Sequence, residues 1–298
     1  MISFRTHVVT LVSVFLALAV GVVLGGGPLS EVGRGGSDSE DVAELRTVAA
    51  EDARRAEAAD RFAGAAAAPL YAGRLTDRQV AVVTLPGADD AVVEALTGQL
   101  VAAGGAVSVV QPVAPTLLNP AEKSLVDTLG TQLAAQLPAG AVPPEATTYD
   151  RIGHLLGLTL AAKDAAGQAP DGRSAAVLES LLGADLLAEA PARERRAPLV
   201  LVVLGDEVDG EGGDALLAAF LRGLGGAAAG IVVAAEDGSE GSQLARLRSD
   251  DSLAGVTSVD EVDAVTGQVA ATLGLIRALT TSGGAFGASG ADGALPLG

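Results

Sequence analysis

The sequence contains no cysteine among its 298 residues, so neither disulfide bonds nor thiolate chemistry can contribute to it. Tryptophan is also absent, and aromatic residues make up only 2% of the chain. Hydrophobic residues nevertheless account for 49%, which leaves alanine, valine and leucine to build the core. A chain of this length can form one or two domains. Without cross-links, their stability must come from packing alone.

Basic side chains are scarce, because Lys123 and Lys163 are the only lysines and the formal net charge is −18. Binding to a nucleic-acid backbone requires clustered lysine and arginine, so we expect no nucleic-acid partner. The same negative charge disfavours a position flat on anionic lipid.

Histidine is nearly absent as well, since the chain has only His7 and His154. A histidine-based catalytic triad or a three-histidine metal site is therefore impossible within one chain. The turn Thr84–Asp89 lacks the G-x-G-x-x-G fingerprint, and the chain has no Walker A, H-E-x-x-H or G-x-S-x-G motif. We predict a non-catalytic protein without a cofactor and interpret His154 as structural; an enzyme is the third choice.

One long apolar run stands near the N-terminus. The segment Val8–Leu24 reads VVTLVSVFLALAVGVVL and contains no charged residue. With the three glycines that follow, it reaches about 20 residues, which as a helix span roughly 30 Å, the thickness of a bilayer core. We predict a transmembrane anchor over residues 1–27, in contact with the membrane through residues 8–27.

The charges that flank this run favour one orientation. Arg5 precedes the run and mainly acidic residues follow it, so we expect a single-pass protein with a cytoplasmic N-terminus and an extracytoplasmic bulk. A cleaved signal peptide is the alternative, because Ala17-Leu18-Ala19 has the spacing of a cleavage site. Both interpretations place the rest of the chain outside the cytoplasm.

A linker and a helical stalk are expected next. Residues 28–39 are rich in glycine and serine, whereas residues 40–68 are dense in strong helix formers. Apolar residues in the second segment follow the 3–4 spacing of a weak coiled coil, with Asp52 at one core position. We expect a homo-oligomer formed through Val42, Leu45, Ala49 and Ala56. An unpaired surface helix is the alternative.

The remainder alternates between short β-branched runs and helical segments. Strands are predicted at residues 79–84, 107–110, 199–204 and 230–235, with a possible edge strand at 256–257. Runs without internal alternation indicate a parallel sheet covered on both faces. The predicted fold is a three-layer α/β domain over residues 77–280, with a helical insertion between strands two and three. The tail at 281–298 is rich in glycine and alanine, so we predict that it is disordered.

One acidic cluster directly follows the third predicted strand. Its members are Asp206, Glu207, Asp209, Glu211 and Asp214. Ligands of open α/β sheets bind beyond the carboxyl ends of strands, and oxygen-rich clusters there can hold Ca²⁺ or Mg²⁺. The spacing differs from that of an EF-hand loop, so a solvated acidic loop that caps the next helix is the simpler interpretation.

Three stretches resemble a known family. Met1–His7 (MISFRTH) followed by Phe15–Gly25 (FLALAVGVVLG) is similar to the start of the actinobacterial copper-transport protein B (MctB) family. Thr257–Asp263 (TSVDEVD), with Gly267, resembles that family's C-terminal stretch. The resemblance implies a cell-envelope protein of copper efflux, with the copper ion as the transported species. The family is described as an outer-membrane channel.

The resemblance also leaves a second role open. Relatives suggest a dimeric, membrane-anchored scaffold that binds an envelope protein during envelope assembly or division. Copper(I) prefers cysteine and methionine ligands, and Met1 is the only such residue here. The residues themselves therefore indicate no resident copper site.

Overall fold

The computed structural model describes residues 37–190, 194–210, 212–249 and 252–297. The predicted anchor at 1–27 and most of the predicted linker at 28–39 lie outside these ranges. Within the described ranges, no helix combines the length and the apolar character needed to cross a membrane. The chain divides into two compact units, with the boundary between Ala59 and Asp60.

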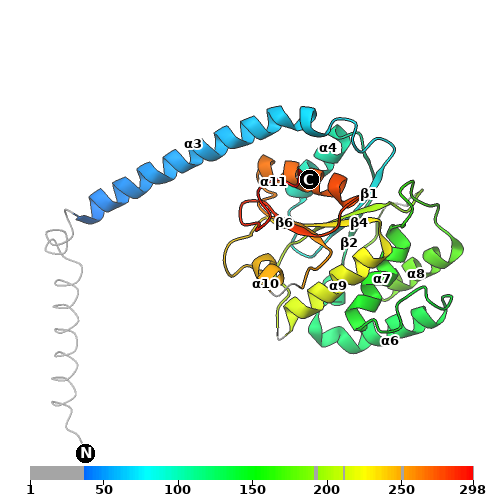
Figure 1. The fold of residues 1–298 in the computed structure, drawn as a ribbon. Helices are drawn as coiled ribbons and strands as arrows, with labels where there is room; N and C mark the ends of the chain where they lie inside the picture. Colours follow the sequence, from blue (N-terminus) through cyan, green and yellow to red (C-terminus); the bar gives the residue numbers. More distant parts are fainter. Residues whose placement is uncertain (1–36, 191–193, 211, 250–251, 298) are drawn as a thin grey trace, which may run out of the picture. The chain divides into compact units, whose positions relative to one another are not determined.

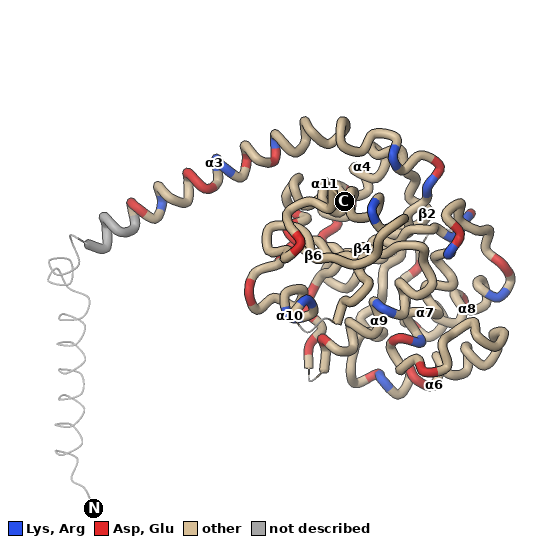
Figure 2. The backbone as a smooth tube through the Cα atoms, in the orientation of Figure 1, with Lys and Arg blue, Asp and Glu red and all other residues tan. Residues whose placement is uncertain are grey.

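The first unit contributes most of helix α3, which runs from Ser37 to Tyr71 and includes the predicted stalk. Alanine, glutamate and arginine, all strong helix formers, dominate this segment. Arg55 pairs with Asp52 at 2.6 Å and with Glu51 at 3.3 Å, and acidic and basic residues alternate along the helix in Figure 2. Residues 43–59 are exposed on every face. The predicted coiled-coil seam stays a prediction, because the structure describes one copy of the chain and the seam would pair α3 with α3 of a second copy.

The second unit is built on a six-stranded parallel sheet. The strands are β1 (Gln79–Thr84), β2 (Ala106–Pro112), β3 (Leu199–Val203), β4 (Gly230–Ala234), β5 (Thr257–Val259) and β6 (Gly284–Phe286). Their order across the sheet is β2-β1-β3-β4-β5-β6, and every neighbouring pair is parallel. This confirms the predicted parallel sheet.

Helices cover both faces of this sheet (Figure 1). One face carries α4 (Asp90–Ala102), α11 (Val265–Ala278) and the end of α3. The other carries the insertion between β2 and β3, together with α9 (Gly213–Ala227). The remaining helices are α5 (Pro115–Leu118), η1 (Pro120–Glu122), α6 (Lys123–Ala135), α7 (Thr148–Leu160), α8 (Gly172–Gly183) and α10 (Gln243–Ser249). The predicted three layers and the predicted helical insertion are therefore present.

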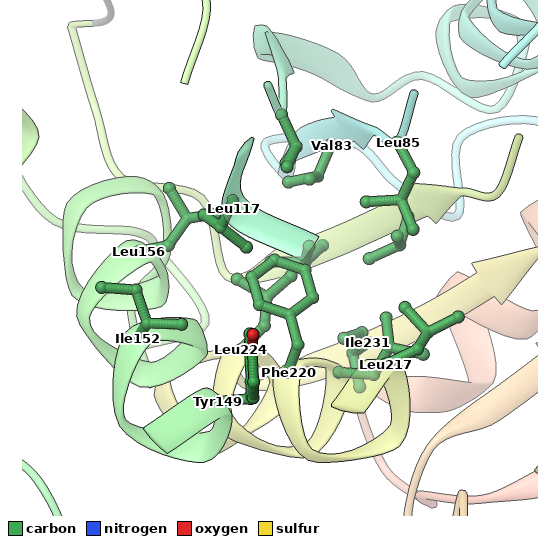
Figure 3. Packing of buried hydrophobic residues seen from close by; sticks show 14 of the residues in the cluster. Val83, Leu85, Leu117, Tyr149, Ile152, Leu156, Leu217, Phe220, Leu224 and Ile231 are labelled. Carbon is green, nitrogen blue, oxygen red and sulfur yellow. The ribbon is translucent and has the colours of Figure 1, made fainter. Parts of the chain in front are cut away.

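Alternate residues of each central strand pack into two separate hydrophobic cores, one on each face of the sheet. In β3, Leu199, Leu201 and Val203 join the core beneath α4 and α11, whereas Val200 and Val202 join the core beneath α7 and α9. Phe220 of α9 fills the middle of the second core, where Figure 3 shows it between Leu117, Leu224 and the strands. The period of two along a strand explains why a run of consecutive apolar residues can be buried throughout.

The prediction of a disordered tail over residues 281–298 is wrong for the described residues beyond 283. Gly284–Phe286 forms β6, which pairs with β5 and makes β5 an internal strand instead of the predicted edge. A buried ion pair holds this tail: Arg248 Nη1 lies 2.5 Å from Asp260 Oδ2, and both side chains bind Ser289. The composition of the tail does not indicate this order, because the residues that bind the tail, Arg248 and Asp260, are distant from it in the sequence.

Several helix boundaries also differ from the sequence-based expectation. α3 continues through Pro69 to Tyr71, since the Tyr71 side chain is fully buried in the core. Within the predicted helical insertion, α8 ends at Gly183 although helix-forming residues continue to Glu189, because Asp185 adopts a positive φ of 57° and Leu187 bridges to Val113. Tertiary contacts override local helix propensity at both places.

The two tyrosines of the chain should respond oppositely to replacement by phenylalanine. The Tyr71 hydroxyl donates to Gln99 Oε1, whereas the buried Tyr149 hydroxyl has no partner among the described residues. A net hydrogen bond contributes about 1 kcal/mol, and a buried hydroxyl without a partner costs a similar amount. We expect Tyr71→Phe to lower the free energy of unfolding by about 1 kcal/mol and Tyr149→Phe to leave it equal or higher. Urea denaturation of both variants checks this, and a clear loss in Tyr149→Phe would contradict it.

Candidate functional site

A crevice lies where the strand order reverses. β1 and β3 are neighbouring strands, the order runs in opposite directions on either side of them, and ligands of doubly wound folds bind beyond the carboxyl ends of such strands. The cavity there measures about 500 Å³, within the range of ligand sites. Its lining residues are Leu85, Pro86, Pro115, Leu118, Asn119, Pro120 and Asp206–Gly210. It is the natural candidate site of this fold.

Two loops are locked together along one wall of this crevice. Asp206 N donates to Pro86 O at 2.8 Å, which joins the loop after β3 to the loop after β1. A Cβ atom on Gly87 would lie 2.3 Å from Asp206 Cγ, and Gly87 has a positive φ of 82°. Only glycine therefore allows this approach. This wall of the crevice is therefore fixed at the backbone by Gly87 and Asp206.

The site is poorly suited to phosphate. α4 begins just after the loop that follows β1 and lines the crevice, and helix N-termini commonly bind anions. Here the Asp89 side chain accepts from Ala91 N at 2.7 Å, so a carboxylate already occupies that position. Asp206 and Asp209 add negative charge at the rim. This geometry agrees with the missing nucleotide fingerprint at Thr84–Asp89.

The structure separates the predicted acidic cluster into two parts. Glu207 and Asp214 both bind Arg246 of α10, at 3.0 Å from Glu207 Oε2 to Nη2 and 2.7 Å from Asp214 Oδ2 to Nε. Gln243 completes the network, with its backbone N–H donating to Glu207 and its side chain to Asp214. For these two carboxylates the counter-ion is a guanidinium group.

The other three members do not join that network. Asp206 and Asp209 are exposed at the crevice, and Glu211 lies outside the described residues. No group of three or more His, Asp or Glu side chains within the described ranges is arranged to hold a metal ion. The predicted cation site stays a prediction for these three residues. Sequence reasoning missed Arg246, because a single arginine in a short helix carries no spacing signal.

Removing the guanidinium should be visible in the titration of Asp214. Hydrogen bonds from Arg246 hold the pKa of Asp214 below its ordinary value of 3.8. We expect the pKa of Asp214 to rise in Arg246→Gln, as measured by carboxyl-carbon NMR. Asp237 is the internal control, because its lowered pKa comes from Ser239 and should not move. An unchanged pKa at Asp214 would show that Arg246 is not its main partner.

His154 lies on α7, half-buried against α9. A Cβ atom on Gly226 would lie 3.0 Å from its Nδ1 atom, so the ring packs directly on the α9 backbone. Burial lowers the pKa of His154, and the charge of Lys163 acts in the same direction. The ring lies apart from the crevice residues, which agrees with the structural role expected from the sequence.

These features define a doubly wound α/β protein whose switch-point crevice is acidic and lacks a phosphate-binding turn. A family model described as "Copper transport outer membrane protein, MctB" matches residues 1–296. Curated proteins named "Copper transporter MctB", from Mycobacterium bovis and Mycobacterium tuberculosis, are 30% identical over 292 residues. These alignments cover 92% of this chain and 92% of each relative.

The chain belongs to the MctB copper transport family. This confirms the resemblance carried by Met1–His7, Phe15–Gly25 and Thr257–Asp263. The family is not one of known enzymes, and its description refers to an outer membrane, which agrees with a location in the cell envelope.

Proposed function

We propose that this protein is a non-catalytic component of copper efflux, anchored in a membrane of the cell envelope by residues 8–27. The observation that carries the proposal is the extent of the family match, which spans residues 1–296 and so includes the apolar N-terminal run. The mycobacterial relatives of similar length are named copper transporters. The N-terminus would lie in the cytoplasm, and the α/β domain of residues 77–280, called the head below, would lie outside it.

Copper is best understood as cargo that passes the head without being stored in it. The chain has no cysteine and one methionine, whereas copper(I) favours sulfur ligands. His154 is half-buried, and within the described ranges no set of metal-ligating residues surrounds it. The expected result is that the purified full chain retains no copper(I) against a chelator at micromolar metal. Stoichiometric retention would contradict this part of the proposal.

Transport through a single apolar helix requires several copies, because one helix has no lumen. The exposed part of α3, residues 43–59, provides a surface for assembly. Most of the stability of a helix in a protein comes from packing of its apolar face, so the exposed apolar stripe of this segment favours a partner. The stripe includes Leu45, Ala49 and Ala56 and continues the seam from Val42. We propose a homo-oligomer paired through these positions.

Complementation in cells tests this function. In a strain that lacks the gene, the full chain should restore growth on copper and lower cell-associated copper, as measured by mass spectrometry. A version without residues 1–27, exported by a cleavable signal peptide, should fail. A version with an unrelated transmembrane helix separates simple anchoring from a specific role of this segment. Full restoration by the soluble version would overturn the anchored mechanism.

A further inference from the structure

Phe62 is the most exposed large apolar side chain among the described residues, at 76%. It belongs to the part of α3 that lies in the second unit, where Ala63, Ala67 and Tyr71 pack into the core. The sequence contains only five phenylalanines, and Phe220 and Phe286 are buried. Exposing an aromatic ring forfeits about 1.5–3 kcal/mol of burial, so this position has a cost that a partner would offset.

An apolar groove lies beside Phe62. Its volume is about 260 Å³, and α3, α11 and the C-terminal tail form its walls. The apolar wall residues include Ala63, Ala66, Leu70, Val269, Ala288 and Leu295. Phe62 itself is one of the residues that line this groove, although most of its side chain is exposed. One face of the molecule thus carries both a projecting ring and a cavity that is apolar enough to receive one.

The same face also carries one exposed basic side chain and one acidic side chain that could pair between two copies. Arg61 precedes the projecting ring, is exposed, and forms no ion pair with any described residue. Glu261 lies in the groove wall. Burial raises the pKa of Glu261, and the carboxylates of Asp260, Asp263 and Asp60 raise it further. An added cation would relieve this crowding of like charges.

We propose that this groove receives Phe62 of a second copy of the chain, with Arg61 of that copy placed beside Glu261. A ring and a cavity on one surface satisfy two-fold symmetry, because each copy supplies to the other what it receives. In an in-register parallel pair, Phe62 of one copy lies level with Ala63 and Ala66 of the other. The inference rests on the homo-oligomer proposed above and identifies its anchoring contact.

The small side chains of the α3 seam support this assignment, because they alone would bury too little surface for a stable dimer. The positions before the head are mostly alanine, with Asp52 at one of them, and alanine contributes little surface. A stable interface buries about 1,200–2,000 Å² in total and is usually dominated by a few aromatic or arginine residues. A buried phenylalanine contributes roughly 150–250 Å². Two Phe62 rings, with two Arg61 side chains, provide the anchors that the alanine seam lacks.

The first test compares two serine variants of the full chain in detergent. Phe62→Ser should weaken self-association at least tenfold, as measured by sedimentation equilibrium. Val101→Ser is the matched control, because Val101 is 62% exposed and lies outside this groove. It should leave the association constant unchanged.

The second test uses the absence of cysteine from the chain. Copies that carry Phe62→Cys are mixed with differently tagged copies that carry Leu295→Cys, so a mixed disulfide reports contact between molecules. Ala68→Cys replaces Phe62→Cys in the control, since Ala68 is exposed and lies outside the groove. We expect the mixed disulfide with Phe62→Cys and at most a trace with Ala68→Cys.

The outcomes separate this inference from the proposed oligomer. A wild-type chain that stays monomeric at tens of micromolar would overturn both. A dimer that keeps its affinity in Phe62→Ser and forms no mixed disulfide would overturn the groove contact and leave the α3 seam standing. A lipid that copurifies in the groove of the dimer, detected by native mass spectrometry, would also overturn the contact, because the cavity would then have another occupant.

Discussion

Replacing Asp260 with asparagine should lower the free energy of unfolding of the head by about 3–5 kcal/mol. The Asp260 side chain is fully buried and accepts hydrogen bonds from Arg248, Ser289 and the backbone of Ala288. Glycine backbones close around it, since a Cβ atom on Gly287 would lie 2.2 Å from its Oδ1 atom. Asparagine keeps the shape and removes the charge, which leaves the buried Arg248 guanidinium without its counter-ion.

Urea denaturation at neutral pH measures this loss, with Asp127→Asn as the control. Asp127 also pairs with an arginine, Arg151 at 3.2 Å, but it is 52% exposed and should cost less than 1 kcal/mol. A loss at Asp260 no larger than that at Asp127 would contradict the role of burial.

The pH dependence of the Asp260 effect has a definite sign. Burial alone would raise the pKa of Asp260, but hydrogen bonds from Ser289 and Arg248 outweigh it and hold the pKa below its ordinary value of 3.8. The stabilisation is therefore complete above that ordinary value and is lost as the pH falls toward the lower, folded-state pKa. The difference between wild type and Asp260→Asn should shrink correspondingly in acid.

Replacing Gly223 with alanine should cost at least about 2–3 kcal/mol. α7 and α9 approach so closely that a Cβ atom on Gly223 would lie 2.0 Å from Asp150 O. The contact is reciprocal, because a Cβ atom on Gly153 would lie 2.2 Å from Phe220 O. Backbone atoms cannot swing aside as a flexible side chain can, so the two helices would have to separate and disturb the core around Phe220.

Gly98→Ala is the matched control for this substitution. Gly98 lies inside α4, and a Cβ atom there would meet nothing within 4 Å. Alanine should therefore raise the free energy of unfolding by about 0.5–1 kcal/mol through its higher helix propensity. Thermal melting of both variants measures the two shifts, which should have opposite signs. A Gly223→Ala protein as stable as wild type would show that the helices can move apart freely.

The sheet was predictable because its signal is local. Runs such as Leu199–Leu204 are apolar at every position, and only a strand covered on both faces buries such a run. β6 escaped prediction for the opposite reason. Gly284–Phe286 has a composition typical of a flexible tail, and its order depends on Arg248 and Asp260, which are distant in the sequence. The close packing of α7 on α9 is likewise a property of two segments together.

The candidate site was predictable in place and not in detail. Two residues of the acidic run after β3, Asp206 and Asp209, line the crevice at the carboxyl edge of the sheet, and a cation site there stays a prediction. The ion pairs of Glu207 and Asp214 depend on Arg246, which α10 brings to that edge from a later part of the chain. Charge along a sequence indicates where carboxylates gather, and only the fold indicates which of them are already neutralised.

The placement of β6 has a consequence for how the protein is made. Translation is vectorial, so the Asp260 carboxylate emerges from the ribosome before Ser289 and the strand that shields it. The contacts around Asp260 therefore cannot be complete until residues 284–289 have left the ribosome and added β6 to the edge of the sheet.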